Sequence, residues 1–220
     1  MAYSCNRVLP SLFLAILLAL CARPAHAETN VPSLAEFIEQ VRNGDAEALR
    51  GMYVPGLFAS LVTQQPKDDP AFVSSAENTL TQFGLASRHG STGLLAHNSA
   101  AGKDFSLLEV GQVFYLIYGN GSLKAFRVTR LQRVRALNSK STQSNFIDLD
   151  GGDFFTAARL FETVYDQSGD VILQTCIESE GDPSWGRLFV IAEPYAGDDP
   201  SWLFEPKPRS YVSILKLPSS

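Results

Sequence analysis

Short runs of β-branched and aromatic residues recur from about residue 80 onward, and they constrain the fold of this chain more than any other feature. Gly, Asp and Asn separate the runs, as they do in tight turns between strands. Asn120-Gly121 lies between two of them and favours a hairpin turn with positive φ. Such regular spacing indicates a mostly-β barrel or sandwich. The predicted strands are Leu94–Ala96, Val113–Tyr118, Leu123–Val134, Phe146–Leu149, Val171–Cys176 and Arg187–Ala192, with a further one expected at Tyr211–Leu217.

The segment before these runs has a helical pattern. Ser33 and Glu36 have the spacing of a capping box at a helix start. Asp45 is expected to cap a second short helix that runs through Leu49 and ends at Gly51. We expect both helices to pack on the outside of the strands. The first helix is marked by apolar residues at i, i+3, i+4 and i+7, namely Leu34, Phe37, Ile38 and Val41.

Residues 1–27 have the composition of a cleavable export signal. Arg7 precedes an apolar stretch, Leu12–Ala22, and Ala25-His26-Ala27 forms an A-x-A cleavage site. The apolar stretch is shorter than the roughly 18 residues that a membrane span needs. We therefore expect residues 1–27 to be a signal peptide, and the mature protein to be exported to an extracellular, cell-envelope or periplasm-like compartment.

Cysteine usage then leaves a single thiol. Cys5 and Cys21 belong to the leader, so Cys176 is the only cysteine of the mature chain. An exported protein with one cysteine forms no internal disulfide. Its thiol is either buried and inert or kept for its reactivity.

The charged and metal-ligating residues argue against binding of nucleic acid or of a metal ion. The whole chain has a formal net charge of −5, and Lys and Arg form no cluster, so nucleic acid is not an expected partner. One Cys and two His leave too few ligands for a typical zinc site. Asp148, Asp150 and Asp153 do not have the spacing of an EF-hand and predict a solvated turn, so calcium is unsupported and no cofactor is expected.

Three residues with catalytic chemistry lie at predicted strand ends. Cys176 ends one apolar strand, and Arg187 begins the next one after a turn-rich loop. Two antiparallel strands joined in this way bring both residues to one end of the sheet. His97 ends another strand, Leu94–Ala96.

Together these side chains suit acyl transfer. A thiolate is the attacking form of cysteine, and an imidazole can take its proton and return it to a leaving amine. A guanidinium supplies fixed positive charge and N–H donors to an oxyanion or to substrate carbonyl groups.

The same residues resemble the sortase family of cysteine transpeptidases. Leu173-Gln174-Thr175-Cys176 matches the family's TLxTC signature, with Ile172 where the first Thr usually stands. Leu94–His97 is similar to the segment that carries the sortase histidine, and Arg187 falls where sortases place their arginine. The resemblance covers roughly residues 60–194. It departs from the family in its leader, because most sortases keep a hydrophobic anchor.

This resemblance implies an eight-stranded β-barrel over residues 60–194. The helical pattern assigns residues 28–59 to an N-terminal helical segment, and residues 195–220 lie outside the match as a C-terminal extension. It implies catalysis by Cys176, His97 and Arg187, with Thr175 and Trp185 near the substrate. The expected partners are a sorting-signal peptide of exported proteins and an amine acceptor from the cell wall or a pilin.

Other interpretations stay open. Cys176 is read alternatively as a buried core residue, and His97 and Arg187 as ordinary strand-end residues. His89-Gly90 is similar to the HG element of L,D-transpeptidases, another class of cell-wall cysteine enzymes, although the SHGC-x-R signature is missing. A secreted module that binds peptides on a sortase-like barrel without turnover is the non-enzymatic alternative.

Overall fold

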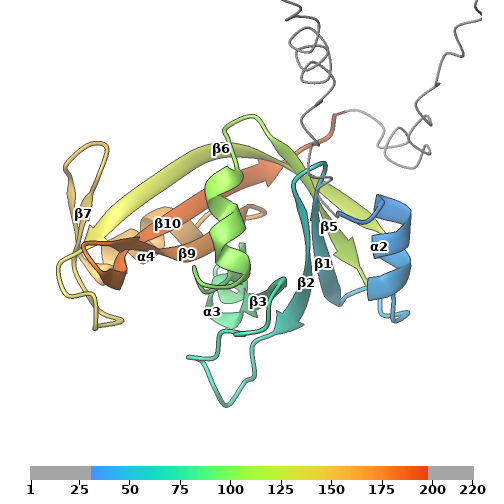
Figure 1. Cartoon of the computed structure of the whole chain (residues 1–220), viewed down its shortest axis with the longest axis horizontal. Helices are drawn as coiled ribbons and strands as arrows, with labels where there is room; N and C mark the ends of the chain where they lie inside the picture. The colour runs from blue at the N-terminus through green and yellow to red at the C-terminus, as the bar shows by residue number, and fades with distance from the viewer. Residues whose placement is uncertain (1–30, 198–220) are drawn as a thin grey trace, which may run out of the picture. The chain divides into compact units, whose positions relative to one another are not determined.

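One β-sheet forms the body of the protein. The computed structural model describes residues 31–197, and Figure 1 shows their arrangement. Among these residues the strands are β1 (Leu49–Val54), β2 (Phe58–Gln64), β3 (Thr79–Phe83), β4 (Thr92–Leu95), β5 (Val113–Tyr118), β6 (Leu123–Ala136), β7 (Phe146–Asp148), β8 (Phe154–Phe155), β9 (Val171–Ser179) and β10 (Asp182–Pro194). The helices are α2 (Leu34–Val41), α3 (Gly84–Arg88), the 3₁₀ helix η2 (Ala101–Leu107) and α4 (Ala157–Tyr165).

Eight of these strands close into a barrel. The order is β10-β9-β4-β3-β2-β1-β5-β6, and β6 pairs in turn with β10. That last pairing runs from Gly186 opposite Arg135 to Pro194 opposite Phe126. The β2–β3 and β4–β9 pairs are parallel, and the others in the ring are antiparallel. The mostly-β, eight-stranded barrel expected from the sequence is confirmed.

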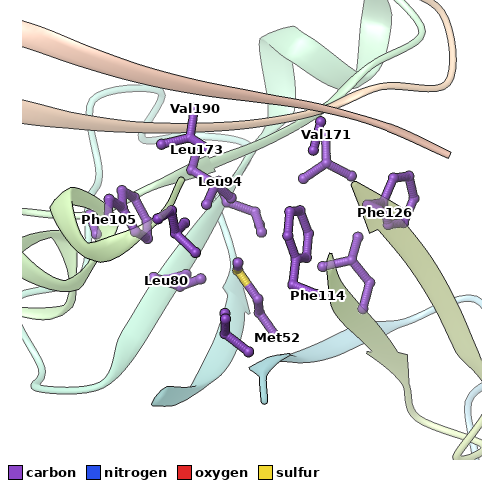
Figure 2. Close-up of a cluster of buried hydrophobic side chains, with 14 of the residues drawn as sticks. Met52, Leu80, Leu94, Phe105, Phe114, Phe126, Val171, Leu173 and Val190 are labelled. Carbon is purple, nitrogen blue, oxygen red and sulfur yellow. The ribbon is translucent and has the colours of Figure 1, made fainter. Parts of the chain in front are cut away.

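Large apolar side chains fill the barrel (Figure 2). Phe114 and Phe126 stack on neighbouring strands, with ring centroids 5.9 Å apart. Interior packing of this kind follows from the alternation of side chains along each strand, which sends every second residue inward. The labelled members of the cluster are Met52, Leu80, Leu94, Phe105, Phe114, Phe126, Val171, Leu173 and Val190.

Helices cover two outer regions of the barrel. Helix α2 packs its apolar stripe on β1 and β5, where Tyr53 and Ile117 belong to the same buried cluster (Figure 1). Its start has the expected capping box, in which Ser33 and Glu36 bond reciprocally. Helices α3 and α4 cover the outer side of β9 and β10. No helix among residues 31–197 combines the length and apolar character required to cross a bilayer.

Several sequence predictions meet the structure at this level. The turn at Asn120-Gly121 is confirmed, because it joins β5 to β6 and Gly121 has φ +88°. The predicted second helix through Leu49 is wrong, because Leu49 begins β1. One face of β1 packs beneath α2 and the other faces the interior of the barrel. β1 and the start of β2 therefore lie in the segment 28–59 assigned to helices. Helix α4 and η2 were not predicted.

Two predictions fall outside the described residues. These are the signal peptide at residues 1–27 and the final strand at 211–217.

Phe114→Ala should lower the free energy of unfolding by about 3–5 kcal/mol, because it leaves a cavity in a fully buried site. Phe154→Ala is the matched control, since that ring is 56% exposed, and it should change stability by less than about 1 kcal/mol. Denaturant unfolding of both variants measures the difference. Equal losses in the two would contradict the assignment of Phe114 to the core.

Candidate functional site

Cys176 and Arg187 lie directly opposite each other on neighbouring strands. The antiparallel β9–β10 ladder pairs them, and β6 continues the row with Val134 opposite Arg187. Directly paired residues point their side chains to the same face of a sheet. Val134 belongs to the cluster beneath α3 and α4, so this face is the outer one. The thiol and the guanidinium therefore share the outer face of the barrel.

Cys176 is a half-buried free thiol. Gln174, two residues earlier on the same face, accepts a 2.6 Å hydrogen bond from the Tyr165 hydroxyl of α4. Burial raises the pKa of Tyr165 far above its ordinary value, so this hydroxyl remains a donor. The Cys176 thiol makes no side-chain hydrogen bond within residues 31–197.

Arg187 is held by backbone carbonyl groups. Its Nη1 donates to Ser184 O at 2.9 Å and to Gly186 O at 2.8 Å. A guanidinium has five N–H groups, so the remaining ones can bind an oxyanion or a substrate carbonyl. The side chain is thus fixed at one nitrogen and open at the others.

His97 follows β4 at the same end of the sheet. β4 is parallel to β9, and Leu95 pairs with Gln174. The next residue continues this contact, with Ala96 N donating to Gln174 O at 3.1 Å. The backbone therefore delivers His97 to the level of Cys176.

The imidazole of His97 contacts the loop between β2 and β3. Its Nε2 lies 3.3 Å from Val73 O. A carbonyl oxygen only accepts, so Nε2 is the donor in this contact and Nδ1 is left outside it. No hydrogen bond joins His97 to Cys176 in the described part of the chain. A separated pair of this kind in an unliganded protein is compatible with closure on substrate.

The backbone after His97 folds tightly against β9. His97 O accepts two amides, Ala100 N and Gly102 N, each at 3.0 Å. A Cβ on Gly102 would approach His97 O to 2.7 Å and would also collide with Thr175 Oγ1. Only glycine fits there, because one of the obstructing atoms belongs to the backbone.

Thr175, which was expected near the substrate, has a buried side chain. Its side chain is buried beneath Gly102 and η2, on the face of β9 opposite to Cys176. Its Oγ1 has no hydrogen-bond partner within the described residues. Strand alternation explains this orientation, since neighbours on a strand point to opposite faces. Trp185, the other expected substrate residue, is half-buried in the segment before Arg187.

The start of β10 leaves the regular ladder. Pairing with β9 is interrupted between Asp182 and Gly186, so Pro183, Ser184 and Trp185 lie outside it. Asp182 Oδ1 accepts Ser184 N at 2.8 Å and stabilises the turn. A hydrogen bond from the Ser139 side chain, the Ser184 amide and the charges of Lys140 and Arg187 lower the pKa of Asp182.

His89 lies at the other end of β4. It follows α3 and precedes Thr92, which pairs with Val171 at the start of β9. Its Nδ1 is 3.8 Å from Asp166 Oδ1, and its ring stands edge-on to Phe161. The length of β9 separates His89 from Cys176, so the structure does not bring these two residues together.

Two other features lie away from Cys176. A pocket of about 610 Å³ is found at the opposite barrel end, where Tyr118, Phe126 and Tyr195 line it. At the β7–β8 hairpin, Asp148 Oδ1 accepts the amides of Asp150 and Gly151. No group of three or more potential metal ligands occurs among residues 31–197.

Sequence reasoning missed the contacts that hold His97. Nothing in the sequence distinguishes Val73, because its carbonyl is a backbone group. The same holds for the contact of Asn98, the residue after His97, whose Nδ2 donates to Pro183 O at 3.0 Å. The one sequence signal for this contact is that a polar residue directly follows the candidate histidine.

The comparisons with known proteins concern the fold. No family model and no curated protein match the chain. Solved structures that resemble it include sortase C1 from Streptococcus suis, at 14% identity and a TM-score of 0.47 over 75% of this chain and 79% of the other. Sortase C-1 from Actinomyces oris has 14% identity and a TM-score of 0.46, over 77% and 84%. Sortase C from Clostridium perfringens, solved with the C-terminal cell wall sorting motif, has 16% identity and a TM-score of 0.41, over 74% and 83%. These three solved structures are sortases, and their likeness to this chain concerns the fold alone.

Thr175→Val should leave stability unchanged or raise it by up to about 1 kcal/mol, because it replaces an unpaired buried hydroxyl by a methyl group of similar shape. Thermal unfolding measures this change. A loss above about 2 kcal/mol would show that the hydroxyl has a partner.

Proposed function

We propose that this protein is a cysteine transpeptidase of the sortase type, which cleaves a sorting motif of exported proteins and transfers the acyl group to an amine. Cys176 is the nucleophile, His97 the proton carrier and Arg187 the electrostatic partner. The observation that carries the proposal is the direct pairing of Cys176 with Arg187 on one face, next to the strand end that delivers His97.

The first half of the reaction forms a thioester. His97 Nδ1 takes the proton of the Cys176 thiol, and the resulting thiolate attacks the peptide carbonyl carbon, so that a C–S bond forms and the carbonyl oxygen becomes an oxyanion. The free N–H groups of Arg187 stabilise that charge. The C–N bond then breaks, and His97 gives a proton to the leaving amine.

The second half regenerates the enzyme. An incoming amine attacks the thioester carbon while Nδ1 of His97 accepts the amine's proton, in keeping with the Nε2–H held by Val73 O. The new C–N bond forms, and the C–S bond breaks to release the Cys176 thiolate. A water molecule in place of the amine would give hydrolysis.

The proposed setting follows from the same chemistry. An export signal at residues 1–27 would bring the enzyme to the compartment where exported substrates and cell-wall or pilin amines occur. No metal or cofactor takes part in these steps.

A peptide-binding module without turnover is the second candidate. The absence of a His97–Cys176 hydrogen bond within the described residues favours it, because a thiol without a base is a weak nucleophile at neutral pH. An L,D-transpeptidase would depend on His89, which lies at the other end of β9 from Cys176.

The test uses a panel of LPxTG-like peptides with an added amine, and mass spectrometry to detect the transfer product and the thioester. Cys176→Ala should abolish both. Arg187→Ala should lower kcat about 10²–10³-fold through the loss of oxyanion stabilisation. His97→Ala should lower it about 10²–10⁴-fold through the loss of proton transfer.

His89→Ala is the matched control and should stay within about twofold of the parent, because surface residues away from the chemistry have small effects. Activity lost in His89→Ala and kept in His97→Ala would favour the L,D-transpeptidase. Peptide binding that survives in Cys176→Ala, with no turnover by the parent chain, would establish the binding module.

A further inference from the structure

Asn98 connects two parts of the candidate site that are far apart in the sequence. Its side chain lies in the loop after β4 and donates to Pro183 O at the start of β10. In the sheet, β9 lies between β4 and β10. The hydrogen bond therefore spans the strand that carries Cys176.

The interrupted ladder at the start of β10 makes this bond available. Pro183, Ser184 and Trp185 are not paired with β9, so their carbonyl groups can accept other donors. Pro183 O accepts Asn98, and Ser184 O accepts Arg187. Adjacent carbonyl groups thus hold the residue after His97 and the guanidinium opposite Cys176.

Within residues 31–197, His97 itself makes no hydrogen bond to β10. Its ring is bonded to Val73, which belongs to the β2–β3 loop, and its carbonyl is bonded to Ala100 and Gly102 of its own loop. These contacts fix the loop to itself and to the β3 side. Asn98 supplies the one hydrogen bond among the described residues that joins this loop to β10.

We infer that Asn98 is a positioning residue that sets the place of the His97 loop relative to Cys176 and Arg187. This inference rests on the proposed function. Asn98 touches no reacting atom. It acts by holding one end of the His97 loop against the start of β10.

The first test needs no substrate. Asn98→Ala should speed amide hydrogen exchange at Ala100 and Gly102 at least about tenfold, because their partner His97 O loses its anchor. Asn98→Gln keeps the donor and should restore much of the protection. Asn120→Ala is the matched control: it removes one side-chain hydrogen bond, to Ser122 N, in the β5–β6 turn at the other barrel end.

The second test measures acyl transfer. Asn98→Ala should lower kcat about 10–100-fold with KM within about twofold, since a displacement of about 1 Å can cost this much. Asn98→Gln should recover part of kcat, and Asn120→Ala should match the parent.

The outcomes separate the two proposals. Unchanged exchange in Asn98→Ala, or a KM change with kcat unaltered, overturns the positioning role whatever the activity. Faster exchange with no turnover in the parent chain overturns the catalytic function and with it the positioning role, although the contact itself would be real.

Discussion

The pairing of β6 with β10 is the interaction on which the rest of the structure depends. It joins the two ends of the strand order and turns an open sheet into a closed barrel. Closure removes the exposed edges that unpaired strands would present and encloses the apolar cluster around Phe114. The same pairing fixes the outer face of β10, because Val134 of β6 lies opposite Arg187. The orientation of the guanidinium is therefore a result of barrel closure.

The parallel pairing of β4 with β9 determines where His97 lies along the β9 strand. In an antiparallel pair, the end of β4 would meet the start of β9 and bring His97 toward Val171. The parallel ladder instead brings the end of β4 to Gln174, two residues before Cys176. His89, at the start of β4, is sent to the far end by the same rule. The direction of β4 thus places His97 at the end of β9 that carries Cys176 and His89 at the other end.

The sequence predicted those parts of the fold that local patterns encode. The capping box at Ser33, the turn at Gly121 and the central strands are local signals, and each is present. β1 was missed because Gly51 and the polar residues before it resemble a helix end, whereas packing beneath Phe37 decides its conformation. At the site, the proximity of Cys176 and Arg187 could be predicted, because two strands joined as an antiparallel hairpin bring them together. The burial of Thr175 and the contacts of Asn98 and Val73 depend on elements distant in the chain, and no local pattern carries that information.

The parallel pair also determines when the site comes into being. His97 is brought to the level of Cys176 by a ladder whose two strands are separated by β5 to β8 in the chain. Contacts of such long sequence separation form late in folding, since their loop-closure entropy must be overcome first. A partly folded chain can pair Cys176 with Arg187 in the β9–β10 hairpin, but it holds no imidazole at the level of the thiol until β4 has joined β9. The three residues of the candidate site are therefore brought together only when the parallel β4–β9 ladder has formed.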